Sequence, residues 1–173
     1  MYQLCGEVLK ETEHAKYLGI TLSSDLQWDH HTSTIAAKAS STLGFITRNL
    51  SNCPKKIKCN AYTSLVRSTL DYAAPVWDPH TQRDKDKLEK INRRAARFVT
   101  GDFRSRQQGA VTTMLKDLKW PSLEQRRRDQ RLTMLYKVSH NLIAVPSTNL
   151  LTPDTRTRAK HSLKYRTLGS NST

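Results

Sequence analysis

The sequence predicts a mainly α-helical protein that begins with a β-hairpin, continues as a bundle of about five helices and ends in an irregular basic tail. Three observations predict this class. Apolar residues between positions 28 and 142 recur every three or four residues, as they do in amphipathic helices. The first 22 residues instead favour β-structure, and the residues after 144 offer little to bury. We expect a hairpin over 1–24, a helical domain over 25–143 and a flexible basic tail over 144–173.

The hairpin is predicted from two β-favouring segments, residues 2–9 and 14–22, which a polar stretch at 10–13 separates. Gly19 lies inside the second segment and indicates a β-bulge, or the close approach of another backbone or of a ligand. Because a two-stranded hairpin is only marginally stable alone, we expect it to pack on the helices or to belong to a larger sheet.

The central helix is predicted between Pro54 and Pro75, followed by a compact aromatic connector that ends at Pro79. We expect the helix to end before Pro75, because a residue that precedes proline is pushed out of the α region. Its core side is predicted along a broad stripe of positions, namely Ile57, Ala61, Leu65 and Thr69, flanked by Tyr62, Val66 and Leu70.

Four further helices are predicted over residues 28–50, 81–100, 111–118 and 122–141. Signals at the helix ends support three of these boundaries. The helix over 81–100 begins at Thr81 and has a glycine, residue 101, just past its end. Ser122 is a typical cap for the start of the last helix. The expected core positions of the first helix are Ile35, Ala39, Leu43, Ile46 and Leu50.

The composition indicates a polyanionic partner. The 173 residues carry a net charge of +14, which favours nucleic acid first and an anionic membrane surface second. No run reaches the roughly 18 apolar residues of a membrane span, and no signal-peptide pattern opens the chain, so we expect no membrane partner. The three unpatterned cysteines are typical of a reduced, intracellular protein in the nucleus or cytoplasm, and neither they nor the adjacent His30 and His31 predict a zinc site.

No catalytic or metal-binding residue is predicted. Polymerases and metal nucleases need carboxylates that converge on Mg²⁺, and this chain has no adjacent acids. Asp84 and Asp86 lie two positions apart on a predicted helix and would point about 200° away from each other. We interpret them as favourable charge near a helix N-terminus, with Asp86 paired to Lys90.

The basic residues are the candidates for nucleic-acid contact. Glu89 and Arg93 are spaced to pair within their helix, whereas Arg97 has no such partner. Arg127 and Arg131 fall on the apolar side of the last helix, so they either pair with Glu124, Asp129 or Asp117 or point into a groove that accepts phosphate. Trp28, Trp77 and Trp120 are expected to anchor the core rather than to stack on bases. The nucleic-acid-binding candidates are Lys56, Arg67, Arg94, Arg97, Arg126, Arg127, Arg128 and Arg131.

Several ordered segments carry a resemblance that covers nearly the whole chain. They are residues 16–20 (KYLGI), 40–50 (SSTLGFITRNL), 64–68 (SLVRS), 70–73 (LDYA), 75–79 (PVWDP), 88–91 (LEKI), 93–99 (RRAARFV), 114–115 with 118–120 (ML, LKW), 123–127 (LEQRR) and 132–137 (LTMLYK). Together they resemble the region downstream of the catalytic palm in non-LTR retrotransposon reverse transcriptases of the Jockey and CR1 type.

The resemblance implies the primer grip, thumb and connector of an RNA-directed DNA polymerase. The fingers, most of the palm, the aspartates that bind Mg²⁺ and the endonuclease would then precede Met1, and this part alone would be inactive. Tyr17, Leu18 and Gly19 are the implied primer-grip residues, and the implied partners are an RNA/DNA primer–template duplex and the remainder of the polymerase. If about six to eight phosphates are neutralised, log affinity should fall with log salt at a slope of about −5 to −7.

Three other interpretations stay open at this point. The chain is also compatible with a stand-alone nucleic-acid-binding module derived from a retroelement. A helical protein-interaction module whose basic face meets an acidic partner is a second alternative. A fragment that does not fold stably is a third, and cooperative thermal unfolding would exclude it.

Overall fold

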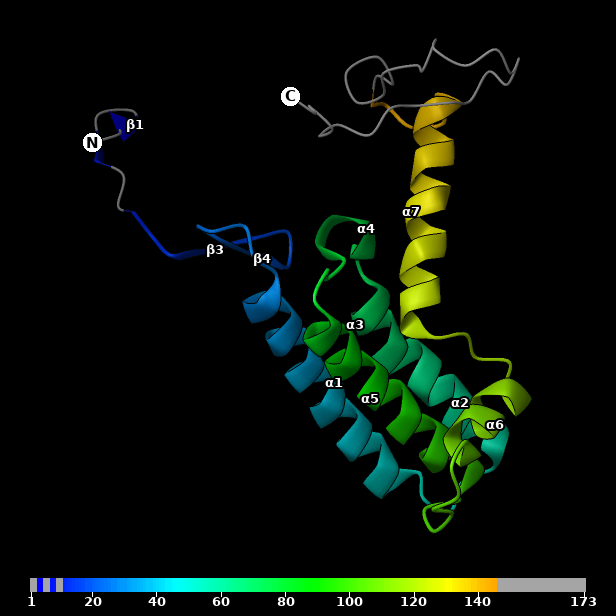
Figure 1. Ribbon diagram of the computed structural model, residues 1–173. Coiled ribbons are helices and arrows are strands. Elements are labelled where there is room, and N and C mark those ends of the chain that lie inside the picture. The colour runs from blue at the N-terminus through cyan, green and yellow to red at the C-terminus, as the bar shows by residue number, and fades with distance from the viewer. Residues whose placement is uncertain (1–2, 5–6, 9–10, 146–173) are drawn as a thin grey trace. The chain divides into compact units, whose positions relative to one another are not determined.

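The computed structural model describes residues 3–4, 7–8 and 11–145, and it is mostly helical after two short hairpins (Figure 1). The chain forms two compact units, Met1–Arg128 and Asp129–Thr173, and each is described by itself. The predicted fold class, a hairpin followed by helices, is confirmed. The predicted basic tail lies outside the described residues from position 146 onward.

The predicted strand pairing is wrong. Strand β1 (Gln3–Leu4) pairs with β2 (Glu7–Val8), and β3 (His14–Tyr17) pairs with β4 (Ile20–Ser23), both antiparallel. Leu18 and Gly19 form the turn between β3 and β4, with φ of 46° and 83°. Two consecutive positive φ values are what a tight two-residue hairpin turn requires. Gly19 is therefore a turn residue and not a bulge within a strand.

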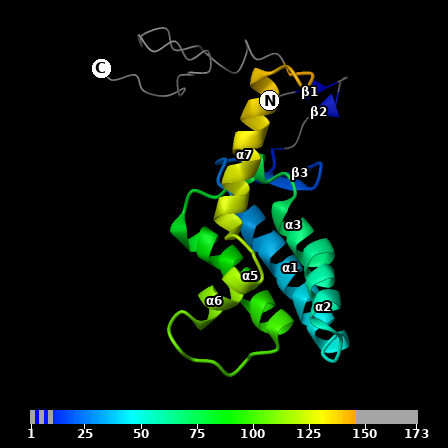
Figure 2. The same cartoon turned by 90° about the vertical axis from the view of Figure 1, so that its right-hand side faces the viewer.

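Helices α1 (Asp29–Asn49) and α5 (Gln82–Thr100) pack against each other, and both match their predicted ranges (Figures 1 and 2). The Thr81 hydroxyl accepts a hydrogen bond from the Asp84 N–H at 3.3 Å and caps the start of α5. Gly101, with φ of 75°, ends the same helix in the left-handed conformation that glycine adopts at no steric cost.

The central helix consists of α2 (Lys55–Ala61), a π-helical segment η1 (Tyr62–Arg67) and α3 (Ser68–Asp71). It ends three residues earlier than predicted, because Tyr72 is extended and Ala73 adopts a left-handed φ of 50°. Pro75 does not terminate this helix. It lies in the first turn of α4 (Ala74–Trp77), where its fixed φ and missing N–H are tolerated.

The predicted core side of the central helix comprised two rows of positions, one running from Ile57 to Thr69 and one flanking it, and the flanking row is the one that is buried. Tyr62, Val66 and Leu70 are buried, whereas Ile57 and Leu65 are 46% and 51% exposed, so the prediction for those two positions is wrong. Both rows have four-residue spacing, and periodicity alone could not separate them. The large ring of Tyr62 decides the outcome, because it stacks on Trp120 with ring centroids 4.5 Å apart.

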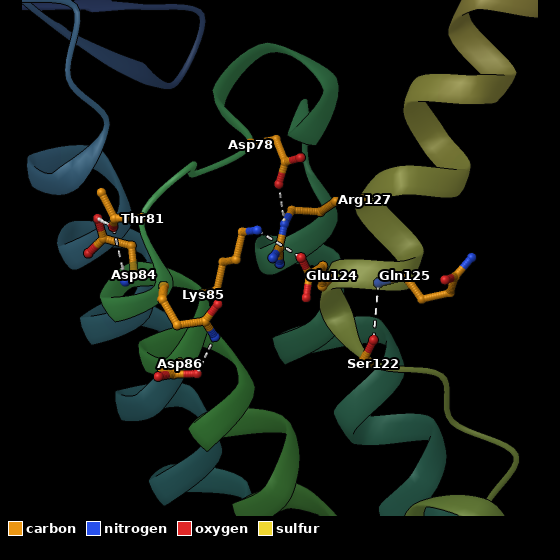
Figure 3. Close-up of polar contacts among 10 residues, drawn as sticks. Asp78, Thr81, Asp84, Lys85, Asp86, Ser122, Glu124, Gln125 and Arg127 are labelled. Carbon is orange, nitrogen blue, oxygen red and sulfur yellow. Dashed lines mark hydrogen bonds and ion pairs between the residues drawn. The ribbon is translucent and has the colours of Figure 1, made fainter.

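Two further helices follow α5. Helix α6 (Ala110–Asp117) packs against α5, and helix α7 (Leu123–Ser139) begins after Ser122, whose hydroxyl accepts a hydrogen bond from the Gln125 N–H at 3.1 Å (Figure 3). The core of the first unit contains Ile20, Ala39, Leu43, Ile46, Tyr62, Val66, Leu70, Ala74, Trp77, Leu88, Ile91, Ala95, Phe98, Val99, Trp120 and Leu123. The prediction that Trp77 and Trp120 anchor the core is confirmed.

A buried chain of hydrogen bonds links three of these elements. The Tyr62 hydroxyl donates to Asn92 Oδ1 at 2.9 Å, and Asn92 Nδ2 donates to Glu89 Oε1 at 2.9 Å. Glu89 Oε2 accepts from the backbone N–H of Leu123 at 2.9 Å. Glu89 therefore caps the start of α7 and does not form the predicted ion pair with Arg93.

Candidate nucleic-acid interface

A cavity of about 570 Å³ lies between the β3–β4 hairpin, α1 and the end of α3. We call it the hairpin pocket. Lysine side chains reach it from two elements, Lys16 from β3 and Lys38 from α1, and none of its described lining residues carries a carboxylate. Its other polar lining residues include His30, Thr34, Ser68 and Tyr72. The pocket therefore combines positive charge with hydroxyl and imidazole groups, which suits a phosphate-bearing ligand.

One of the three predicted primer-grip residues lines this pocket, and the other two neighbour it in the sequence. Gly19 lines it, whereas Tyr17 and Leu18 are 66% and 71% exposed. The Tyr72 hydroxyl donates to the Leu18 carbonyl at 3.0 Å and so fastens the turn to the end of α3. Leu18 has a left-handed φ that costs a non-glycine residue roughly 1–2 kcal/mol, and this hydrogen bond helps to hold it.

A buried histidine joins the hairpin to α1. His31 is 3% exposed, and its Nδ1 accepts a hydrogen bond from the Thr21 N–H at 3.2 Å, which places the proton of the neutral ring on Nε2. The rings of Trp28 and Trp77 meet the imidazole edge-on at 6.3 and 5.4 Å. Burial, and secondarily the neighbouring His30, lower the pKa of His31. The neutral form is thus the one that the fold requires.

The predicted basic residues do not form one cluster. Lys56 and Arg128 are exposed, and Arg67 is half-buried. Arg94 Nη1 donates to Ser40 Oγ at 2.7 Å and keeps its side chain on the surface between α5 and α1. Arg97, for which no acidic partner was expected, donates instead to two backbone carbonyls of the loop after α5.

Arg126 and Arg127 are held by aspartates that the sequence did not identify. Arg126 Nη2 lies 2.6 Å from Asp71 Oδ2. Arg127 Nε lies 2.7 Å from Asp78 Oδ1, a pair that Figure 3 shows. Arg127 is only 1% exposed, so its guanidinium faces the interior, and we remove it from the candidates for phosphate contact. Its Nη1 has no hydrogen-bond partner among the described residues.

One of the acidic partners that the sequence suggested for Arg127 and Arg131 is held by a lysine instead. Glu124 pairs with Lys85 at 2.8 Å (Figure 3). Arg131 is exposed and belongs to the second unit. Both units expose basic side chains, and the described residues that line the hairpin pocket belong to the first unit.

The acidic residues of α5 follow a different pairing from the predicted one. Asp84 is buried and pairs with Lys87 at 2.8 Å, while Asp86 accepts from Gln82 Nε2 at 2.9 Å rather than from Lys90. Within residues 3–4, 7–8 and 11–145 there is no group of three or more His, Cys, Asp or Glu side chains placed to hold a metal ion. In the same part of the chain, no helix is long and apolar enough to cross a membrane.

Comparison with protein-family models, with curated proteins and with solved structures finds no match to this chain. The resemblance to reverse transcriptases therefore stays a prediction from the sequence segments. Sequence reasoning included Lys16 in one of those segments but did not single out Lys38, whose contribution depends on how α1 packs beside the hairpin. The one feature of the sequence that pointed to Lys38 as a pocket residue was its place in a helix rich in small side chains, 22 residues after Lys16.

The Arg127–Asp78 pair predicts a large stability effect. Asp78→Ala leaves the buried guanidinium without its carboxylate and should lower the free energy of unfolding by about 3–5 kcal/mol. Asp71→Ala is the matched control, because the Arg126 side chain is 29% exposed and water can hydrate it, so the loss should be about 1 kcal/mol. Chemical denaturation measures both values. Equal losses in the two variants would contradict the assignment of a buried pair, and Asp78→Ala combined with Arg127→Met should recover most of the larger loss.

The lowered pKa of His31 predicts how stability changes with pH. The folded chain binds fewer protons than the unfolded chain once the pH falls below the ordinary value of 6.5. Stability should therefore be full above that value and decline as the pH falls through the folded-state pKa. His31→Asn retains an acceptor for the Thr21 N–H and should flatten this decline. Urea midpoints measured from about pH 8 to about pH 5 test it, and parallel curves for the two proteins would exclude the histidine as the cause.

Proposed function

We propose that the chain is the primer-grip and thumb portion of a non-LTR retrotransposon reverse transcriptase and that it holds a primer–template duplex by its phosphates. One observation carries the proposal. Two of the resembling segments, residues 16–20 and 70–73, meet through the Tyr72–Leu18 hydrogen bond and border one cationic pocket. Segments more than 50 residues apart thus converge on the position where the resemblance implies the primer terminus.

The proposed contact is electrostatic and independent of base sequence. Lysine ammonium groups are compact, strongly hydrated charges that suit phosphate oxygens as point contacts. Lys16 and Lys38 would bind phosphates at the pocket. The exposed basic side chains of residues such as Lys56, Arg94 and Arg128 would extend the contact along the duplex. Such a protein would act in the nucleus or cytoplasm, where its nucleic acid is found.

The proposed role is to position the duplex rather than to carry out the chemistry. The carboxylates that bind Mg²⁺ and catalyse nucleotide addition would come from the remainder of the polymerase. Gly19 suits the turn because its φ of 83° is one that residues with a side chain rarely adopt. A Cβ at this position would lie 3.5 Å from the Tyr72 ring, which is an ordinary contact, so the backbone conformation and not crowding favours glycine. The bare backbone of the turn also allows a ligand to approach it closely.

A second candidate function is a protein-interaction helix. In the second unit, α7 exposes four large apolar side chains within five residues, namely Leu132, Met134, Leu135 and Tyr136. Exposed apolar groups so close together favour a protein partner. Arg131 precedes this stretch and Lys137 follows it, so an acidic partner would suit it best.

Binding of a short blunt RNA–DNA hybrid tests the proposed function. Lys16→Ala combined with Lys38→Ala should weaken binding about tenfold and make the salt slope shallower by about two, because two phosphate contacts are lost. Lys90→Ala combined with Lys116→Ala removes the same charge from exposed positions on α5 and α6 and should change the affinity less than about threefold. Fluorescence anisotropy at several salt concentrations provides both quantities.

Two outcomes would overturn the proposal. The first is wild-type protein that does not bind the hybrid in dilute buffer. The second is an equal loss in the pocket variant and the control variant, which would indicate a diffuse attraction by net charge. A protein that binds the hybrid but fails to stimulate a polymerase domain supplied in trans would support the stand-alone binding module instead.

A further inference from the structure

A second basic surface with an exposed aromatic ring lies at the loop between α5 and α6. Phe103 is 56% exposed there, and the exposed Arg104 and Arg106 follow it. A cavity of about 150 Å³ adjoins its ring and is lined by Leu43, Thr47, Arg94, Arg97, Phe98 and Phe103. We call this surface the Phe103 site. Its described lining residues are all different from those of the hairpin pocket.

The loop that carries Phe103 is held in place from both sides. Arg97 Nη1 and Nη2 donate to the carbonyls of Asp102 and Ser105 at 3.2 and 3.0 Å. The Asp102 carboxylate accepts from the N–H groups of Arg104 and Ser105 at 3.1 and 2.9 Å, and from the Ser105 hydroxyl. The exposed ring is therefore presented by a fixed backbone rather than by its own packing.

Three exposed arginines lie in the cavity lining or on the loop that carries Phe103. Arg94 is exposed at the rim, where Ser40 fixes its guanidinium, and it lies on the same helix as Arg97. Arg104 and Arg106 are exposed on the loop itself, and the cavity lining contains no acidic residue among those that the structure describes. Guanidinium groups bind phosphates and also stack on planar rings.

The size and lining of the cavity define the class of ligand. A volume of about 150 Å³ is well below the roughly 300–1,000 Å³ of sites for drug-sized ligands, so it suits one planar ring. Thr47 carries the one side-chain hydroxyl among the described lining residues, and because it donates to the Leu43 carbonyl it has no proton left to donate to a base edge. Stacking on Phe103 is thus the main contact that the site offers to a base, and stacking is tolerant of base identity.

We infer that the Phe103 site binds single-stranded nucleic acid by stacking one unpaired base on Phe103, with Arg94, Arg104 and Arg106 on the flanking phosphates. A paired base is already stacked on both faces within a duplex, so only an unpaired one is free to contact the ring.

This inference does not depend on the proposed duplex contact. Lys38 and Thr47 are nine residues apart on α1, or about 14 Å, so a strand that leaves a duplex at the hairpin pocket can reach the site within a few nucleotides.

Two probes with the same phosphates separate stacking from charge attraction. One is a short oligothymidine, and the other is an abasic oligomer of equal length. Wild-type protein should bind oligothymidine about tenfold more tightly than the abasic oligomer, because one stacked base contributes about this factor. Phe103→Ala should abolish the preference and leave the affinity for the abasic oligomer and for a blunt hybrid unchanged.

Two further variants complete the test. Phe45→Ala removes another exposed phenylalanine, 57% exposed on α1 and absent from the cavity lining, and should retain the full preference. Phe103→Trp should also retain it and should show quenching of its added fluorescence by oligothymidine but not by the abasic oligomer. Equal affinity of the wild-type protein for the two oligomers would overturn the inference. So would an equal weakening of both by Phe103→Ala, and neither result would bear on binding of the blunt hybrid.

Discussion

The buried hydroxyl of Tyr62 imposes the constraint on which the first unit depends. Tyr62 is fully buried, and an unsatisfied hydroxyl there would cost about 1–3 kcal/mol, so Asn92 must face it. Asn92 in turn orients Glu89, and Glu89 accepts the N–H that opens α7. Burial raises the pKa of Tyr62, so the group stays a donor. This series of hydrogen bonds fixes the central helix, α5 and the start of α7 in one register, that is, at one position along each other. The Trp120 ring stacks on the tyrosine ring.

That register determines which charges are neutralised and which remain on the surface. It brings Asp71 and Asp78, on either side of α4, to Arg126 and Arg127 at the start of α7. Two of the arginines in the most basic stretch of sequence are thus used in holding the helices together. The lysines of the hairpin pocket and Arg94, Arg104 and Arg106 near Phe103 are exposed to solvent instead. A high net charge alone would not have identified these two surfaces.

The sequence predicted what periodicity and end signals can determine. The ranges of α1 and α5, the helix start at Thr81 and the glycine end at residue 101 follow from local chemistry and are confirmed. The turn at Leu18 was missed because a leucine rarely adopts positive φ, and the end of the central helix was missed because no proline marks Tyr72. Arg127 could not be matched to Asp78, since 49 residues separate them and only the packed core brings them together. Phe103 was passed over in a loop whose arginines and glutamines dominate the local composition.

The central claim is that the hairpin pocket is where a primed duplex meets this protein. An NMR titration of the ¹⁵N-labelled chain with a primed RNA–DNA hybrid tests it most directly, because each backbone amide reports its own surroundings. We predict that the first and largest shifts occur at residues 16–21 of the hairpin and 30–38 of α1, with α6 unaffected. Shifts confined to α7, or spread evenly over every exposed basic residue, would contradict it.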